Sequence, residues 1–156
     1  MFKKAQAAME FLMTYGWAIL VVLAAIAALA YFGVLSPDRF LPEKCTMPSG
    51  VACLDFSVNA ASNSITLSLQ NAAGFDMSSA ALNISDLTPA GLSCTQSPMG
   101  TGSVANGQKE NIVVNCTGIS ALSANTKIRG KISLTYTNTA TTLAHEAIGE
   151  IIAKRP

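Results

Sequence analysis

The sequence has few residues of the kinds that catalysis, metal binding or nucleic-acid binding require. It contains one histidine, His145, and charged residues make up only 12% of its 156 residues. It has no nucleophile motif, phosphate-binding loop or group of metal ligands, so we predict a protein that is not an enzyme and has no cofactor. The basic residues Arg129 and Lys131, and the pair Lys154 and Arg155, are typical of a solvated surface, and we expect no nucleic-acid partner. We predict that His145 lies at the surface.

Large aromatic residues are scarce after residue 35, where the sequence has Phe40, Phe56, Phe75 and Tyr136. About 110–120 residues remain there, enough for one domain, whose core should be small and aliphatic. Covalent links would help such a core, and all four cysteines lie in this part of the chain: Cys45, Cys53, Cys94 and Cys116. Three pairings are possible. We favour Cys45–Cys53 and Cys94–Cys116, because each pair is close in sequence.

Residues 6–35, in contrast, form one long apolar run. Glu10 is its only formally charged residue, and the 25 residues from Phe11 to Leu35 carry no charge. This length exceeds the roughly 18–20 apolar residues that span a bilayer. Apolar residues fall on every side, which predicts a helix enclosed by lipid or by other protein. The small residues from Ala24 to Ala30 would let helices approach closely, although a simple membrane anchor needs only the length.

The start of the chain carries a resemblance to a known family. Lys3, Lys4 and Ala5 precede Gln6-Ala-Ala-Met-Glu10 and the apolar run, and this arrangement resembles the class III signal peptide of archaeal type IV pilins. The resemblance covers about 35 residues. It implies that a prepilin peptidase removes residues 1–5 by cutting between Ala5 and Gln6, and that a pilus assembly platform and ATPase then build a filament from copies of the chain.

Glu10 would be the fifth residue of the processed chain, where type IV pilin-like proteins carry a glutamate. A carboxylate in an apolar setting needs a partner, and the new α-amine at Gln6, in the same or a neighbouring copy, would supply one. Alternatively, Glu10 lies among lipid headgroups with no specific role. The residues expected to support helix assembly are Glu10, Phe11, Gly16, Ala24, Ala25 and Ala28.

Two alternatives to a filament remain open. Ala28-Leu29-Ala30 fits the cleavage site of a conventional secretory signal, in which case the apolar run would be discarded. The chain could also keep residues 1–5 and remain a monomeric, membrane-tethered extracellular binding domain. Lys3 and Lys4 predict a cytoplasmic N-terminus, so the rest of the chain should lie outside the cell, where disulfides persist.

The remaining residues predict a linker followed by a β-rich head. Residues 36–50 contain three prolines and are predicted to be a linker with a disulfide-closed turn, in which Ser36-Pro37 ends the helix. Residues 51–156 show apolar and polar residues in alternation, as in Ile65-Thr-Leu67-Ser-Leu69, separated by turn-forming clusters. We therefore predict an α+β protein with an N-terminal helix and a mostly antiparallel β-sandwich of immunoglobulin-like type.

Three further features concern the head. Residues 143–154 fit either a helix or a closing strand, and we favour a strand with a bulge at Gly149. Two sequons, at Asn83 and Asn115, are possible glycosylation sites, and strand alternation predicts that both side chains point away from the core. Together with the family resemblance, these observations predict a subunit of an extracellular, surface-attaching filament with a membrane-inserted precursor.

Overall fold

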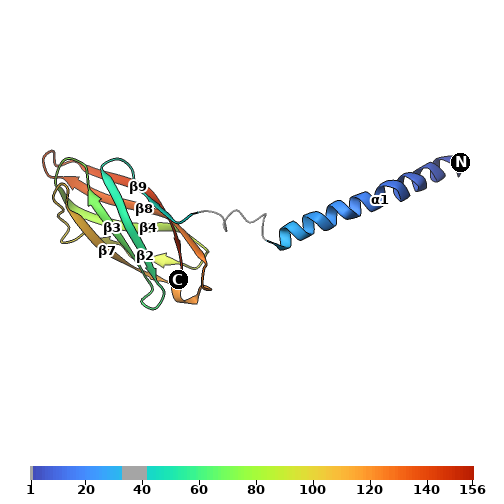
Figure 1. Ribbon diagram of the computed structural model, residues 1–156. Coiled ribbons are helices and arrows are strands. Elements are labelled where there is room, and N and C mark those ends of the chain that lie inside the picture. The colour runs from blue at the N-terminus through green and yellow to red at the C-terminus, as the bar shows by residue number, and fades with distance from the viewer. Residues whose placement is uncertain (1, 33–41) are drawn as a thin grey trace. The chain divides into compact units, whose positions relative to one another are not determined.

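The chain divides into two compact units, Met1–Leu41 and Pro42–Pro156. A computed structural model describes residues 2–32 and 42–156, with side chains described from residue 8 onward (Figure 1). The predicted linker residues 36–41, including Ser36 and Pro37, therefore lie outside the described residues.

The first unit is a single helix, α1, which spans Phe2–Tyr31. It begins four residues before the predicted start at Gln6, so the expected leader continues into the same helix. It ends at Tyr31, and the predicted helix residues 33–35 lie outside the described residues. Within α1, Ala8–Tyr31 is long and apolar enough to cross a membrane, with a mean hydropathy of 2.2.

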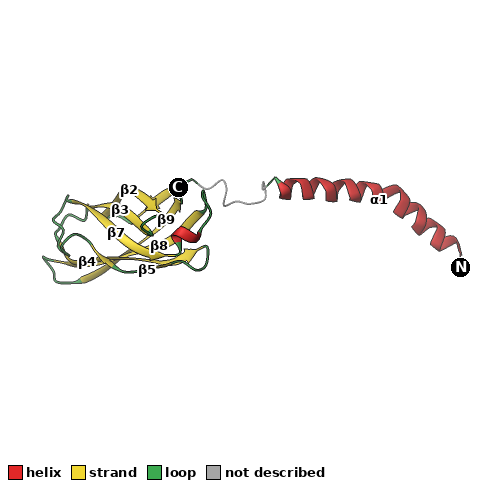
Figure 2. Cartoon of the chain, turned by 90° about the horizontal axis from the view of Figure 1, so that it is seen from below, coloured by secondary structure: helices red, strands yellow, loops and turns green. Residues whose placement is uncertain are grey.

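The second unit is a sandwich of two antiparallel sheets (Figure 2). The five-stranded sheet, called sheet A, has the order β1 (Lys44–Thr46), β9 (Ala144–Lys154), β8 (Lys127–Asn138), β4 (Met77–Thr88) and β6 (Ser97–Pro98). The four-stranded sheet, called sheet B, has the order β2 (Val51–Asn59), β3 (Ser64–Asn71), β7 (Lys109–Thr117) and β5 (Ser93–Cys94). A short 3-10 helix, η2 (Ile119–Ala121), follows β7. The predicted α+β class and β-sandwich are confirmed.

The core between the sheets is aliphatic, as the scarcity of aromatics predicts. Alternate residues of the long strands point inward, and most of the large buried side chains are Ile, Leu and Val, with Met77 and Met99. The aromatic residues Phe56, Phe75 and Tyr136 are only partly buried and pack against this core. Period-two alternation thus identified the inward face of β3, β7 and β8.

Two predictions about the head are wrong. Residues 42–50 belong to the second unit, because Lys44–Thr46 forms β1 and pairs with Glu150–Ile152 of β9. Gly149 is not a bulge: β9 is the predicted closing strand, but it pairs with β8 in unbroken register, with Gly149 opposite Ile132. A glycine is needed there because the connection after β1 crosses β9 so closely that an added Cβ would collide with Thr46 O and Met47 Sδ.

Candidate interaction surfaces

The apolar surface of α1 is the largest candidate for contact with lipid or protein. From Ala8 to Tyr31 nothing in the described residues buries this helix. Trp17 and Leu20, for example, are 66% and 67% exposed. Water-exposed apolar surface of this extent marks a protein or membrane interaction site. The structure alone fits both a membrane anchor and an assembly helix.

The predicted assembly residues lie along this helix. Glu10 accepts a hydrogen bond at its backbone oxygen from Thr14 Oγ1, at 2.8 Å. The rings of Phe11 and Tyr15 lie 4.6 Å apart between centroids, as expected for residues one turn apart. A Cβ added at Gly16 would meet nothing within 4 Å. The space beside this glycine is therefore open, and a neighbouring helix could approach the backbone closely there. Ala24, Ala25 and Ala28 are exposed in the same way. Lys3, Lys4, Ala5 and Gln6 are helical, but their side chains lie outside the described set.

The cysteines form the two pairs that sequence proximity favours. Cys45–Cys53 joins β1 to β2 and so links sheet A to sheet B, whereas Cys94–Cys116 joins neighbouring strands of sheet B. Both bonds close short loops, with sequence separations of 8 and 22 residues. Disulfides of this kind indicate an oxidising extracellular environment.

The two sequon asparagines both lie on outer faces of the sandwich, as predicted. Asn115, on β7, is exposed, whereas Asn83, on β4, is half-buried between β8 and β6. Their inward neighbours, Ile84 and Cys116, are in the core.

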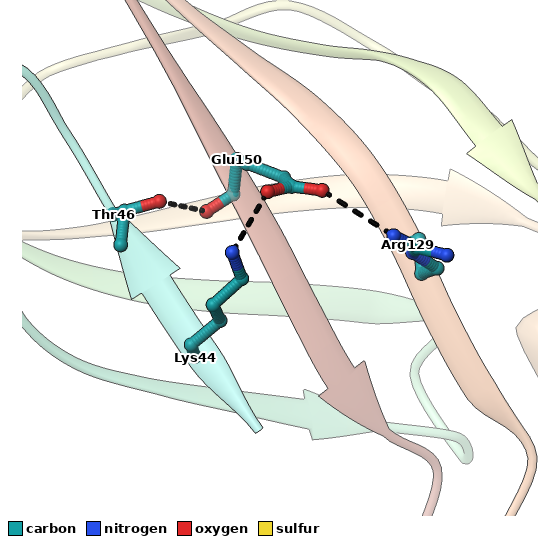
Figure 3. A network of polar contacts seen from close by, with 4 residues as sticks. All are labelled: Lys44, Thr46, Arg129 and Glu150. Atoms are coloured by element: carbon teal, nitrogen blue, oxygen red, sulfur yellow. Dashed lines mark hydrogen bonds and ion pairs between the residues drawn. The ribbon is translucent and has the colours of Figure 1, made fainter. Parts of the chain in front are cut away.

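Charged side chains from three strands meet on the outer face of sheet A (Figure 3). Lys44 Nζ donates a hydrogen bond to Glu150 Oε2 at 2.9 Å, and Arg129 lies 3.7 Å from the other carboxylate oxygen. The hydrogen bond and charge of Lys44, followed by the charge of Arg129, hold the pKa of Glu150 below its ordinary value. All three side chains are more than two-fifths exposed, so this network is a surface feature.

Five basic residues share this part of the sheet. The strand register places Lys127 opposite Lys154, Arg129 and Lys44 on either side of Ile152, and Lys131 opposite Glu150. We call these five residues, Lys44, Lys127, Arg129, Lys131 and Lys154, the basic face. A shallow groove of about 400 Å³ lies beside it, and its lining includes two basic residues, Arg129 and Lys131, and two acidic residues, Asp86 and Glu150. No local sequence pattern identifies this surface, because its residues come from three separate segments of the chain.

His145 is exposed, as predicted, and belongs to a small aromatic group. Its ring stacks on Tyr136 with centroids 5.5 Å apart, and Phe75 lies 6.2 Å from Tyr136 and 6.3 Å from His145. Within residues 8–32 and 42–156, the structure brings together no group of three or more potential metal ligands. The described neighbours of the His145 ring are thus the rings of Tyr136 and Phe75.

No protein-family model matches the chain, and a comparison with curated proteins also finds no match. The surfaces described above are therefore the basis on which a function can be argued.

Proposed function

We propose that this chain is a structural subunit of an extracellular filament resembling type IV pili, which assembles through α1 and serves surface attachment. Before assembly, α1 would hold the chain in the membrane. The observation that carries this proposal is the apolar surface of Ala8–Tyr31, which is exposed on all sides in the described chain. A helix with this surface is stable only when lipid or other chains enclose it.

The residues of α1 favour enclosure by copies of itself over a purely anchoring role. Lipid tails are as apolar as leucine side chains, so the hydrophobic effect does not drive helices together within a membrane. Helix association there depends instead on close packing and polar contacts. Gly16 and the alanines at 24, 25 and 28 offer the small surface that close packing needs. Glu10 offers a charge, which a neighbouring α-amine at Gln6 would neutralise after processing.

The head suits the outside of such a filament. Its core is complete within Pro42–Pro156, so it does not need α1 to bury apolar residues. Its two disulfides suit an oxidising environment. A stable, self-contained sandwich would thus form an outer sheath around packed helices.

The role of Glu10 provides the test. The variant Glu10→Gln keeps the size of the side chain but removes its charge. We expect normal removal of residues 1–5 and normal membrane insertion, but a loss of filaments by negative-stain electron microscopy. The matched control is Glu43→Gln, which makes the same change at an exposed position of the head and should leave filaments unchanged.

Filaments of normal abundance and order from Glu10→Gln would contradict the proposed pairing. A chain that keeps Met1 and stays monomeric in the membrane would instead support the tethered binding domain. A chain that begins at Tyr31 would show that the apolar run is a discarded signal.

A further inference from the structure

The basic residues of the head are concentrated towards one end. Residues 42–156 contain seven basic and seven acidic residues. Six of the seven basic residues lie where β8 begins and β9 ends: the five residues of the basic face and Arg155. The seventh, Lys109, begins β7 and pairs with Gln70, at the opposite end of the sandwich. A neutral head therefore has one strongly basic surface.

This surface is dense in positive charge, and two of its basic side chains flank a buried residue of the sheet. Two acidic side chains accompany the five basic ones: Glu150, which pairs with Lys44, and Asp86, which lines the adjoining groove with Arg129 and Lys131. Basic groups therefore outnumber acidic groups by five to two. Ile152 points to the same outer face and yet is 1% exposed and not part of the inner core. Its neighbours on both sides are Lys44 and Arg129, whose aliphatic stems can cover it while their charged groups remain in water.

The basic face also lies where the chain reaches the head. Lys44 belongs to β1, two residues after the second unit begins at Pro42. Nine residues, 33–41, connect Phe32 to Pro42, and fully extended they reach at most about 35 Å. If α1 lies in a bilayer, as the proposed function requires, this tether keeps the basic face near the headgroups at high effective concentration.

We propose that the basic face docks the unassembled subunit onto anionic lipid headgroups of the membrane that holds α1. This inference rests on the proposed membrane-inserted precursor. Juxtamembrane clusters of Lys and Arg are attracted to anionic lipid surfaces through their combined charge. A sheet face with five basic groups suits an extended anionic surface. In this state the membrane would orient the head before assembly.

A second copy of the chain is a weaker candidate for the same surface. The acidic side chains away from the basic end are dispersed, and each is bonded within its own head. Asp76 accepts a hydrogen bond from the backbone of Asn106, Glu110 from Gln108, and Glu146 from Ser133. In residues 42–156 these acids form no patch that matches the basic face in density.

The test uses the full chain reconstituted into two kinds of vesicle. One kind contains phosphatidylcholine alone, and the other contains seven parts phosphatidylcholine to three parts phosphatidylglycerol. An amine-reactive reagent is applied at low salt, and labelling of each lysine is read by mass spectrometry. We expect labelling of Lys131 and Lys154 to fall at least about threefold in the anionic vesicles. Labelling of Lys109, the internal control, should be unchanged. Because charge attraction is screened by salt, the protection should disappear at about 0.5 M salt.

Three variants with single charge changes sharpen the test. Removing a positive charge with Arg129→Gln should lower the salt concentration at which Lys131 and Lys154 become labelled. Removing the negative charge that pairs with Lys44 and Arg129, with Glu150→Gln, should raise that concentration. Lys109→Gln, which changes charge at the opposite end, should leave it unchanged.

Equal labelling in both kinds of vesicle would overturn the proposal. If the chain then still resists extraction by alkaline carbonate, the anchor stands and only the docking fails. If carbonate extracts the chain, the membrane-inserted precursor itself is wrong. Protection that appears in neutral vesicles and increases with protein density would identify a second copy as the occupant, and would also overturn lipid docking.

Discussion

Gly149 provides the sharpest test of how the head is packed, and we predict that Gly149→Ala destabilises it. A Cβ at this position would collide with Thr46 O and Met47 Sδ and lie 3.2 Å from Met47 Cα. Two of these atoms are backbone, so a simple side-chain rotation cannot relieve the collision. The connection after β1 must therefore move away from β9, and the hydrogen bond between Lys44 and Glu150 would be disturbed.

The size of the effect follows from two opposing terms. Overpacking a well-filled site destabilises a protein by about 1–3 kcal/mol, and we take about 2 kcal/mol here. Replacing glycine by alanine restricts the unfolded chain and restores about 0.5 kcal/mol. The net loss is then about 1.5 kcal/mol. The head spans Pro42–Pro156, and with an unfolding entropy of about 0.24 kcal/mol/K for that length, the melting temperature should fall by about 6 °C.

Calorimetry of the full chain in detergent micelles would measure this shift, and two variants serve as controls. In Gly130→Ala the new Cβ would meet two side-chain atoms, Ile84 Cγ2 at 2.9 Å and Leu87 Cδ2 at 3.0 Å, and its nearest backbone contact would be an ordinary 3.5 Å to Ser85 O, so only side chains would have to shift. Its melting temperature should fall by less than about 3 °C. Ile148→Ala, at a neighbouring position that is 48% exposed, should change little. A shift for Gly149→Ala no larger than that for Gly130→Ala would refute this reasoning.

Three further predictions concern the core, the disulfides and the charged network. Leu67→Ala, at a fully buried position, should destabilise the head by about 2–5 kcal/mol. Val113→Ala, at an outward position that is 51% exposed, should change stability by less than about 0.5 kcal/mol in the same denaturant titration; similar losses would mean that the sheet faces are misassigned. Replacing both cysteines of Cys94–Cys116 by serine should destabilise the head by about 3.4 kcal/mol, from the entropy of closing a 22-residue loop; an unchanged denaturation midpoint would count against the bond. The lowered pKa of Glu150 means that its pairing with Lys44 stabilises the head above the ordinary glutamate pKa and that this contribution is lost as pH falls through the lowered value. The difference in melting temperature between the native chain and Glu150→Gln should therefore shrink as pH falls from 7 to 3, and a constant difference would contradict this assignment.

Much of the head could be predicted from the sequence because its long strands have one buried and one wet face. Ile65, Leu67 and Leu69 alternate with polar residues, and the structure buries all three. The short strand β1 escaped prediction because three residues, one of them a cysteine, show no recognisable period. Ile152 is an exception to the alternation of buried apolar and exposed polar residues. It is apolar and buried, and yet it lies on the outer face of sheet A.

The surfaces could be predicted only where they are local in sequence. The apolar helix occupies one continuous run, so composition alone identified it. The basic face depends on the strand register that brings Lys44, Arg129 and Lys154 together across three strands. A local sequence pattern cannot predict how separate strands pair.

The proposed filament requires that the apolar helix remains on the mature chain and packs against copies of itself. The most direct measurement is the N-terminal sequence and intact mass of subunits from purified surface filaments. We expect a chain that begins at Gln6, with Glu10 as its fifth residue and the whole of Ala8–Tyr31 retained. Subunits that begin at Tyr31 would contradict it, because a filament made from them could not have this helix at its centre.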